Sequence, residues 1–417
     1  MSHSLRLHRF TLDNGMRVVV NHDPHSAMAV VNLLYNTGSR DENRQRTGIA
    51  HLFEHLMFGG SANVADFDEA LEIAGGSSNA WTSNDFTNFY QTLPAANIET
   101  ALYLESDRMR SLDFSQRSLQ IQQGVVIEEF KQTCLNRPYG DIWHRLRNLA
   151  YSKDHPYSWP TLGLMPQHIA DMSLADIKNW FYAHYAPNNA ILSIVGGIPP
   201  EKAEKLVAKW FGPIPPRDIN KRVLPDVGFP TQSKEEIVRA AVPDVQIVMA
   251  YPMDKYGTKR YFAADTISDL LSVGRSSRFY KNLIKGEGSG LFANADASIL
   301  GSEHEGLLLL NATINSKNDT DIAKAKYLLN KTAESLFTQE LSQYELERSL
   351  NNFETSFLLD NMQPENRAAN IALAEYHNED INSTISCRKQ LTVSDVKHES
   401  VKLFQDTPSA SIIYIPE

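Results

Sequence analysis

Two histidines four residues apart give this sequence its clearest chemical signal. His51 and His55 frame the pentapeptide His-Leu-Phe-Glu-His, and on a helix two such side chains point the same way. Two imidazoles one turn apart can bind one zinc ion. Glu54 follows His51 by three positions and lies beside it on the helix surface, where it can act on a water molecule without taking a coordination position. The order H-x-x-E-H is the inverted form of the H-E-x-x-H helix of zinc proteases.

A catalytic zinc site needs a further protein ligand. Such sites usually have three protein ligands and one open position, so a carboxylate on a second helix is expected. Residues 124–131 form an apolar run that leads into two adjacent glutamates on a predicted helix. The pattern alone does not choose among Glu129, Glu128 and the more distant Glu105.

The elements around this helix follow from periodicity and turn residues. The helix itself is predicted over residues 49–58 and ends at two glycines, and the apolar run at residues 27–35 predicts a central strand. Residues 77–93 predict one further strand. Within it, four residues follow two turn glycines and have the pattern of an edge strand, which can accept a peptide backbone by strand addition. These candidate substrate-binding residues are Asn79, Ala80, Trp81 and Thr82.

The second half of the chain repeats the first in outline. We expect a zinc-binding domain over residues 1–215, a linker over 216–234 and a homologous domain without metal over 235–417. A helix at residues 259–271 takes the place of the zinc helix and contains no histidine. The predicted fold class is α+β, with two homologous domains that each have a mostly antiparallel sheet and helices packed on one face.

Composition excludes several classes of protein. The 417 residues carry a formal net charge of −10, which argues against a nucleic-acid binder. No apolar run is long enough to span a membrane, so a soluble protein without membrane insertion is expected. Residues 1–20 show no signal peptide. This predicts the cytoplasm, or the bacterial periplasm if a signal peptide was removed. The two cysteines predict neither a disulfide framework nor a zinc site.

Four motifs resemble the pitrilysin-type zinc peptidases, a family that includes insulin-degrading enzyme and the mitochondrial processing peptidase. They are residues 12–15, 48–58, 75–82 and 185–189. The similarity covers the whole chain, is strongest to about residue 215, and is closest to the short, two-domain bacterial members. It implies that the two domains form one half of a clamshell that encloses peptides or unfolded polypeptides.

The resemblance also implies roles for individual residues. In this family the third zinc ligand is a glutamate some 70 to 80 residues after the second histidine, commonly the second of a Glu-Glu pair, which corresponds to Glu129. One Zn²⁺ per chain would be held by His51, His55 and Glu129, with Glu54 as the general base. Several relatives have a glutamate where this chain has Gln122, so the role of that carboxylate has no counterpart here.

The resemblance further implies a partner subunit. In family members the half opposite zinc supplies an arginine and, seven residues later, a tyrosine that stabilise the reaction intermediate. The corresponding residues 283–293 contain neither. A zinc endopeptidase active as a heterodimer is therefore expected, with a related subunit that lacks the zinc motif and carries the Arg/Tyr pair; a homodimer is less favoured. The alternative is a non-catalytic structural or assembly subunit of a processing-peptidase-like complex, although such subunits usually have broken zinc motifs.

Overall fold

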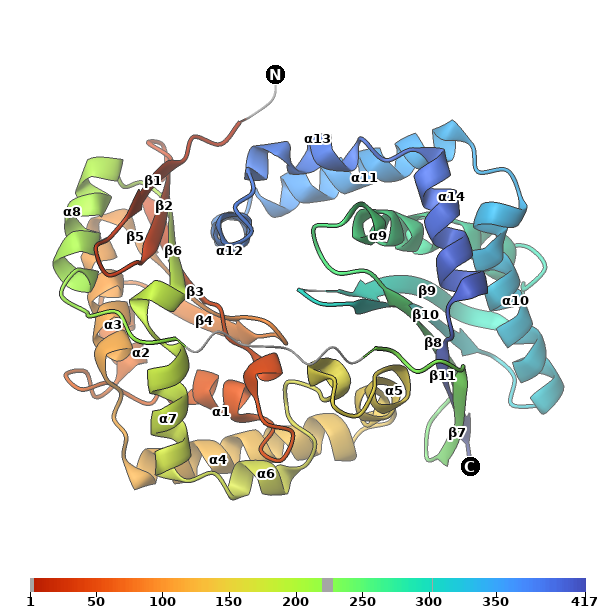
Figure 1. Ribbon diagram of the computed structural model, residues 1–417, viewed down its shortest axis with the longest axis horizontal. Coiled ribbons are helices and arrows are strands. Elements are labelled where there is room, and N and C mark those ends of the chain that lie inside the picture. Colours follow the sequence, from red (N-terminus) through yellow and green to blue (C-terminus); the bar gives the residue numbers. More distant parts are fainter. Residues whose placement is uncertain (1–3, 220–227, 302) are drawn as a thin grey trace. The chain divides into compact units, whose positions relative to one another are not determined.

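The computed structural model describes residues 4–219, 228–301 and 303–417. Packing divides them into two units (Figure 1). Unit 1 contains the described residues of 1–131, 159–224 and 356–384, and unit 2 contains those of 132–158, 225–355 and 385–417. The contiguous domains expected at 1–215 and 235–417 thus differ from the packing units by two exchanged segments. Residues 220–227 of the expected linker lie outside the described residues.

Unit 1 is built on a six-stranded sheet with the order β1-β2-β6-β3-β5-β4. Neighbouring strands are antiparallel except β2 and β6, which run parallel. The sheet is therefore mostly antiparallel, as expected. Its strands are β1 (His8–Thr11), β2 (Arg17–His22), β3 (Met28–Tyr35), β4 (Ser77–Thr82), β5 (Thr87–Pro94) and β6 (Ala190–Gly196).

The expectation of a single strand over residues 77–93 is wrong, because this segment folds as the β4–β5 hairpin. The hydroxyl of Ser83 accepts hydrogen bonds from the backbone N–H groups of Asp85 at 3.1 Å and Phe86 at 3.0 Å. The chain therefore reverses without glycine or proline. The reversal leaves β4 at one edge of the described sheet.

Helices cover one face of this sheet and enclose the larger core. Phe53 and Phe181, from two of these helices, pack in one buried cluster with strand residues such as Val31, Leu33 and Leu192. The helices of unit 1 that precede residue 220 are α1 (Ile49–Leu56), α2 (Phe67–Ile73), α3 (Ile98–Arg110), α4 (Gln116–Phe130), α6 (Pro166–Ala170), α7 (Leu174–His184) and α8 (Pro200–Phe211).

The reverse face of the sheet is covered by α12 (Pro364–Tyr376), a helix from the second half of the chain. Its Ala368 and Ile371 pack against Val30 and Val195, and Ser193 donates a hydrogen bond to the carbonyl of Ala368 at 2.7 Å. Helices thus lie on both faces rather than on one. Burial on both faces explains why β3 and β6 are mostly apolar instead of alternating between apolar and polar residues.

Unit 2 repeats this plan. Its sheet order β7-β11-β8-β10-β9 matches β2-β6-β3-β5-β4, including the one parallel pair, β7 with β11. Helix α9 lies between β8 and β9 in the chain, as α1 lies between β3 and β4. The strands are β7 (Lys234–Ala240), β8 (Val245–Met253), β9 (Phe292–Leu300), β10 (Gly306–Ile314) and β11 (Ala410–Pro416). The α+β fold with two related sheets is therefore confirmed.

The helices of unit 2 also lie on both faces of its sheet. Helix α5, from the first half of the chain, packs Leu146 and Ala150 against Val248 and Ile412. The helices of this unit are α5 (Ile142–Ala150), α9 (Lys259–Ser272), α10 (Asp319–Thr338), α11 (Gln343–Asp360), which runs into unit 1, α13 (Thr384–Arg388) and α14 (Val393–Val401). No helix among the described residues has the length and apolar character needed to cross a membrane.

Candidate metal centre

Helix α1 is fixed by packing on one side and presents polar residues on the other. Leu52, Phe53 and Leu56 are buried, and the ring of Phe53 lies 4.3 Å from that of Tyr185, centroid to centroid. The helix follows Gly48, which has a φ of +94° and gives no side-chain cap. A Cβ there would also meet the carbonyl oxygen of Leu162 at 3.1 Å, so both conformation and space favour glycine.

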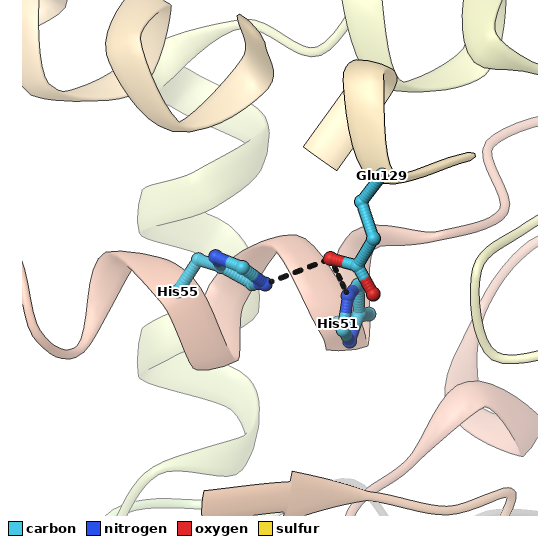
Figure 2. A group of neighbouring side chains, drawn as sticks. All are labelled: His51, His55 and Glu129. Carbon is cyan, nitrogen blue, oxygen red and sulfur yellow. Dashed lines mark hydrogen bonds and ion pairs between the residues drawn. The ribbon is translucent and has the colours of Figure 1, made fainter. Parts of the chain in front are cut away.

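The two histidines of α1 converge on one carboxylate of α4 (Figure 2). The Nε2 atoms of His51 and His55 lie 3.2 Å and 3.4 Å from Oε2 of Glu129. One ligand atom from each residue can be chosen so that all three lie within 4.8 Å of one another. Among the described residues, no other group of three histidine, cysteine, aspartate or glutamate side chains gathers in this way.

The phase of helix α4 determines which glutamate reaches the histidines. Leu119, Gln123, Val126 and Phe130 face the core, and Glu129 lies on the flank of this buried face. Each of the other two glutamates that the sequence left open has a different partner. Glu128 is exposed and pairs with Lys131 at 3.4 Å, whereas Glu105 is fully buried and accepts hydrogen bonds from Arg108 and Gln91.

The charges within the cluster are coupled. Burial lowers the pKa of His51, but its hydrogen bond to the carboxylate of Glu129 and the nearby carboxylate of Glu54 outweigh this effect and raise the pKa to about 9. Hydrogen bonds from His51 and His55 hold the pKa of Glu129 well below its usual range. A metal ion that binds His51 must therefore displace a proton from its imidazole ring.

The donor set fits zinc. Two imidazole nitrogens and one carboxylate oxygen are the three protein ligands found in one class of catalytic zinc sites. The histidines are mostly buried and Glu129 is half-buried, so the cluster is open on the side of the carboxylate. A catalytic site of this class also requires one position for a further ligand.

Glu54 lies beside this cluster and outside the set of candidate ligands. Its Oε2 atom is 3.7 Å from Nδ1 of His51 and accepts a hydrogen bond from the Thr82 hydroxyl at 2.5 Å. Thr82 ends β4, the edge strand that contains Asn79 to Thr82. The structure therefore places the predicted substrate strand next to the helix with the predicted general base.

Glu42 is a site residue that the sequence did not reveal. Its Oε1 atom accepts a hydrogen bond from the backbone N–H of Ala50 at 3.0 Å, so it caps the first turn of α1 where Gly48 cannot. Glu42 and Ala50 are eight positions apart in the sequence, which is farther than local capping patterns extend. An acidic residue shortly before a helix was the only available signal.

Glu42 should make the stability of the protein depend on pH. Burial raises the pKa of its carboxyl to about 8 from 4.5, against the opposing hydrogen bonds from Ala50 and Gly48. Because the folded state binds the Glu42 proton more tightly than the unfolded state, protonation of Glu42 stabilises the fold. This stabilisation is complete below pH 4.5 and is lost as the pH rises through about 8. The unfolding free energy of the wild type should fall relative to that of Glu42→Gln by about 1–3 kcal/mol over this window. Denaturant unfolding of both proteins at pH 5 and pH 9 measures the difference, and an equal change in both would contradict it.

The segment that would contain the arginine and tyrosine lies in unit 2. Residues 283–293 end in the first residues of β9, where Ala293 is exposed. Arg278, upstream of this segment, is buried; it donates a hydrogen bond to Ser335 at 3.0 Å and pairs with Glu345 at 3.2 Å. The guanidinium of Arg278 is therefore occupied by contacts within unit 2.

Comparisons with known proteins match this architecture. The family model described as "Insulinase (Peptidase family M16)" matches residues 17–161, and the model described as "Peptidase M16 inactive domain" matches residues 171–353. Zinc protease PqqE of Helicobacter pylori is 28% identical over 418 residues, which span 97% of this chain and 92% of that protein.

Solved structures give the same result for the fold. The crystal structure of a protease from Helicobacter pylori has a TM-score of 0.90 at 27% identity and matches 99% of this chain and 100% of that one. The periplasmic protease PqqL from Escherichia coli has a TM-score of 0.80 at 20% identity, and this chain matches 48% of its length. The two family models follow each other along the chain and together span most of it, and with these relatives they show that the protein belongs to peptidase family M16.

Proposed function

We propose that this protein is a zinc-dependent endopeptidase that hydrolyses peptides or unfolded polypeptides. The observation that carries the proposal is the convergence of His51, His55 and Glu129, with Glu54 adjacent to these ligands and not among them. A family member named as a zinc protease aligns over nearly the whole chain. Metal-assisted hydrolysis requires protein ligands for the metal and a separate carboxylate that can act on water.

The side chains of the site divide the chemistry among them. His51, His55 and Glu129 would hold one zinc ion per chain. Bound there, zinc would polarise the substrate carbonyl and lower the pKa of a water molecule to about 7. Glu54 accepts the proton of the attacking water as general base and passes it to the leaving amine.

The edge strand β4 would bind the substrate. An extended peptide can add to the open edge at Asn79–Thr82 through main-chain hydrogen bonds. Such bonds do not depend on side-chain identity, so recognition would tolerate many sequences. Folded proteins lack a free strand at the scissile bond, which favours peptides and unfolded segments as substrates.

The active form would be a heterodimer with a related subunit. Residues 283–293 offer neither an arginine nor a tyrosine to stabilise the intermediate, and PqqL, a chain with this fold, is about twice as long. A second M16 chain without the zinc motif would supply the pair, and a homodimer would need other oxyanion donors. A non-catalytic assembly role is the second candidate, favoured by the "inactive domain" model over residues 171–353. The intact zinc motif favours the enzyme.

The test is to measure zinc and cleavage of an unfolded polypeptide by the purified chain, alone and with an M16 chain from the same organism that lacks the pentapeptide. We expect one zinc per chain, weak cleavage alone and at least about 100-fold more with the partner, since oxyanion donors contribute 10²–10³. A chelator should abolish cleavage and zinc should restore it. Full activity of the homogeneous chain would refute the heterodimer, whereas no cleavage by the zinc-loaded mixture would favour the assembly role.

A further inference from the structure

The hydroxyl of Thr82 has a position fixed by the sheet. Thr82 pairs with Thr87 in the β4–β5 ladder. Thr87 is fully buried, and its own hydroxyl donates a hydrogen bond to the carbonyl of Thr37 at 3.0 Å. The β-branched Thr82 side chain has few rotamers on such a strand. Its hydroxyl therefore reaches α1 from a rigid support.

This hydroxyl engages one of the two oxygens of Glu54. Oε2 accepts the bond from Thr82 at 2.5 Å, and the same oxygen lies 3.7 Å from Nδ1 of His51. Within the described part of the chain, no protein hydrogen bond to Oε1 is found. Since the last torsion of a glutamate side chain is broad, an unrestrained carboxylate would rotate freely. The contact with Thr82 removes that freedom.

We propose that Thr82 is a positioning residue for Glu54, and this inference rests on the proposed function. The Thr82 hydroxyl holds Oε2, and Oε1 is left to take the proton from the attacking water. The proton moves from the water oxygen to Oε1, and the bond from Thr82 stays in place throughout. The strand that would bind the substrate thus also aligns the general base.

Removing the donor should lower turnover without weakening substrate binding. Thr82→Val keeps the β-branched shape and deletes the hydroxyl. We expect kcat to fall by about 10- to 100-fold, because a hydrogen bond to a charged group contributes about 1.5–3 kcal/mol. KM should stay within about twofold, and zinc content should be unchanged. Thr82→Ser retains the donor and should recover most of the lost kcat.

Ser78→Ala is the matched control, because Ser78 lies on the same strand and its hydroxyl donates to a carboxylate, that of Asp68, at 3.1 Å. It should leave kcat and KM unchanged. Thr82→Ala is a second donor-free variant if valine impairs folding. An unchanged kcat in the donor-free variants, an increase in KM alone, or an equal loss in Thr82→Ser would overturn the inference. Glu54→Gln separates failure of this inference from failure of the proposed function. If Glu54→Gln loses activity, the proposed function stands and only the role of Thr82 is refuted. If Glu54→Gln stays active, the proposed function itself fails.

Discussion

Replacing Glu54 by glutamine should leave the fold and the zinc content unchanged and lower kcat by about 10²- to 10⁴-fold, the usual contribution of a general base. Glutamine has the same shape, and its carbonyl oxygen can still accept the bond that Thr82 donates. It cannot take a proton from water. Since Glu54 is outside the cluster of His51, His55 and Glu129, all three candidate zinc ligands remain in the variant.

The measurement is single-turnover cleavage of an unfolded polypeptide by the complete complex, with zinc determined in the same samples. Glu128→Gln is the control, because Glu128 is an exposed glutamate on the neighbouring helix that pairs with Lys131. That variant should retain wild-type kcat. A Glu54→Gln protein with full zinc and undiminished turnover would exclude Glu54 as the general base and would remove the main chemical argument for hydrolysis.

The elements closest to the site were predictable because their sequence signals are local. The helix predicted at residues 49–58 is observed as Ile49–Leu56, so it ends with Met57 as its C-cap, before the two glycines that were expected to stop it. The strand at residues 27–35 is β3, Met28–Tyr35. In both cases the residues that determine the element lie within it or directly beside it.

The β4–β5 hairpin was not predicted, although Ser83, Asn84 and Asp85 are turn-forming residue types. The side chain of Ser83 holds this turn. Residues 77–93 are rich in threonine, asparagine and aromatic residues, a composition that favoured the interpretation as one strand. Only the paired register, Ser77 with Thr92 through to Thr82 with Thr87, reveals two.

The exchange of helices between the halves of the chain also could not be predicted from the sequence. Periodicity shows which face of a helix is apolar and does not name the partner of that face. Helix α12 packs on the sheet of unit 1 and α5 on the sheet of unit 2, each far along the chain from the strands it covers. The mostly apolar character of β3 and β6 is consistent with burial on both faces, but the sequence analysis expected helices on one face only.

For the three candidate glutamates, the family resemblance gave information that the sequence pattern did not. Glu105, Glu128 and Glu129 all occur in helical segments, and composition cannot distinguish them. The family resemblance selected Glu129, and the structure places that residue next to both imidazoles. The other two are engaged by Arg108 and Lys131. The choice depends on packing of α4 against α1, which no single segment encodes.

Replacing Glu129 by glutamine should weaken zinc binding by at least about 100-fold. Loss of a residue that merely orients a ligand typically costs 10- to 100-fold in metal affinity, and Glu129 is proposed as a ligand itself. A neutral amide oxygen is a weaker donor than a carboxylate to a divalent cation. Because the Glu129 side chain is 40% exposed, the stability of the metal-free protein should change by less than about 1 kcal/mol.

The same substitution at the two other glutamates makes the result specific. Glu128→Gln should keep wild-type zinc affinity, and Glu105→Gln should lower stability, because it leaves the buried guanidinium of Arg108 without its charge partner. Competition with a chromogenic chelator gives the affinities, and denaturant unfolding of the metal-free proteins gives the stabilities. If Glu129→Gln and Glu128→Gln bound zinc equally well, the third ligand would have to be sought elsewhere, and α4 would lose its proposed role in the metal site.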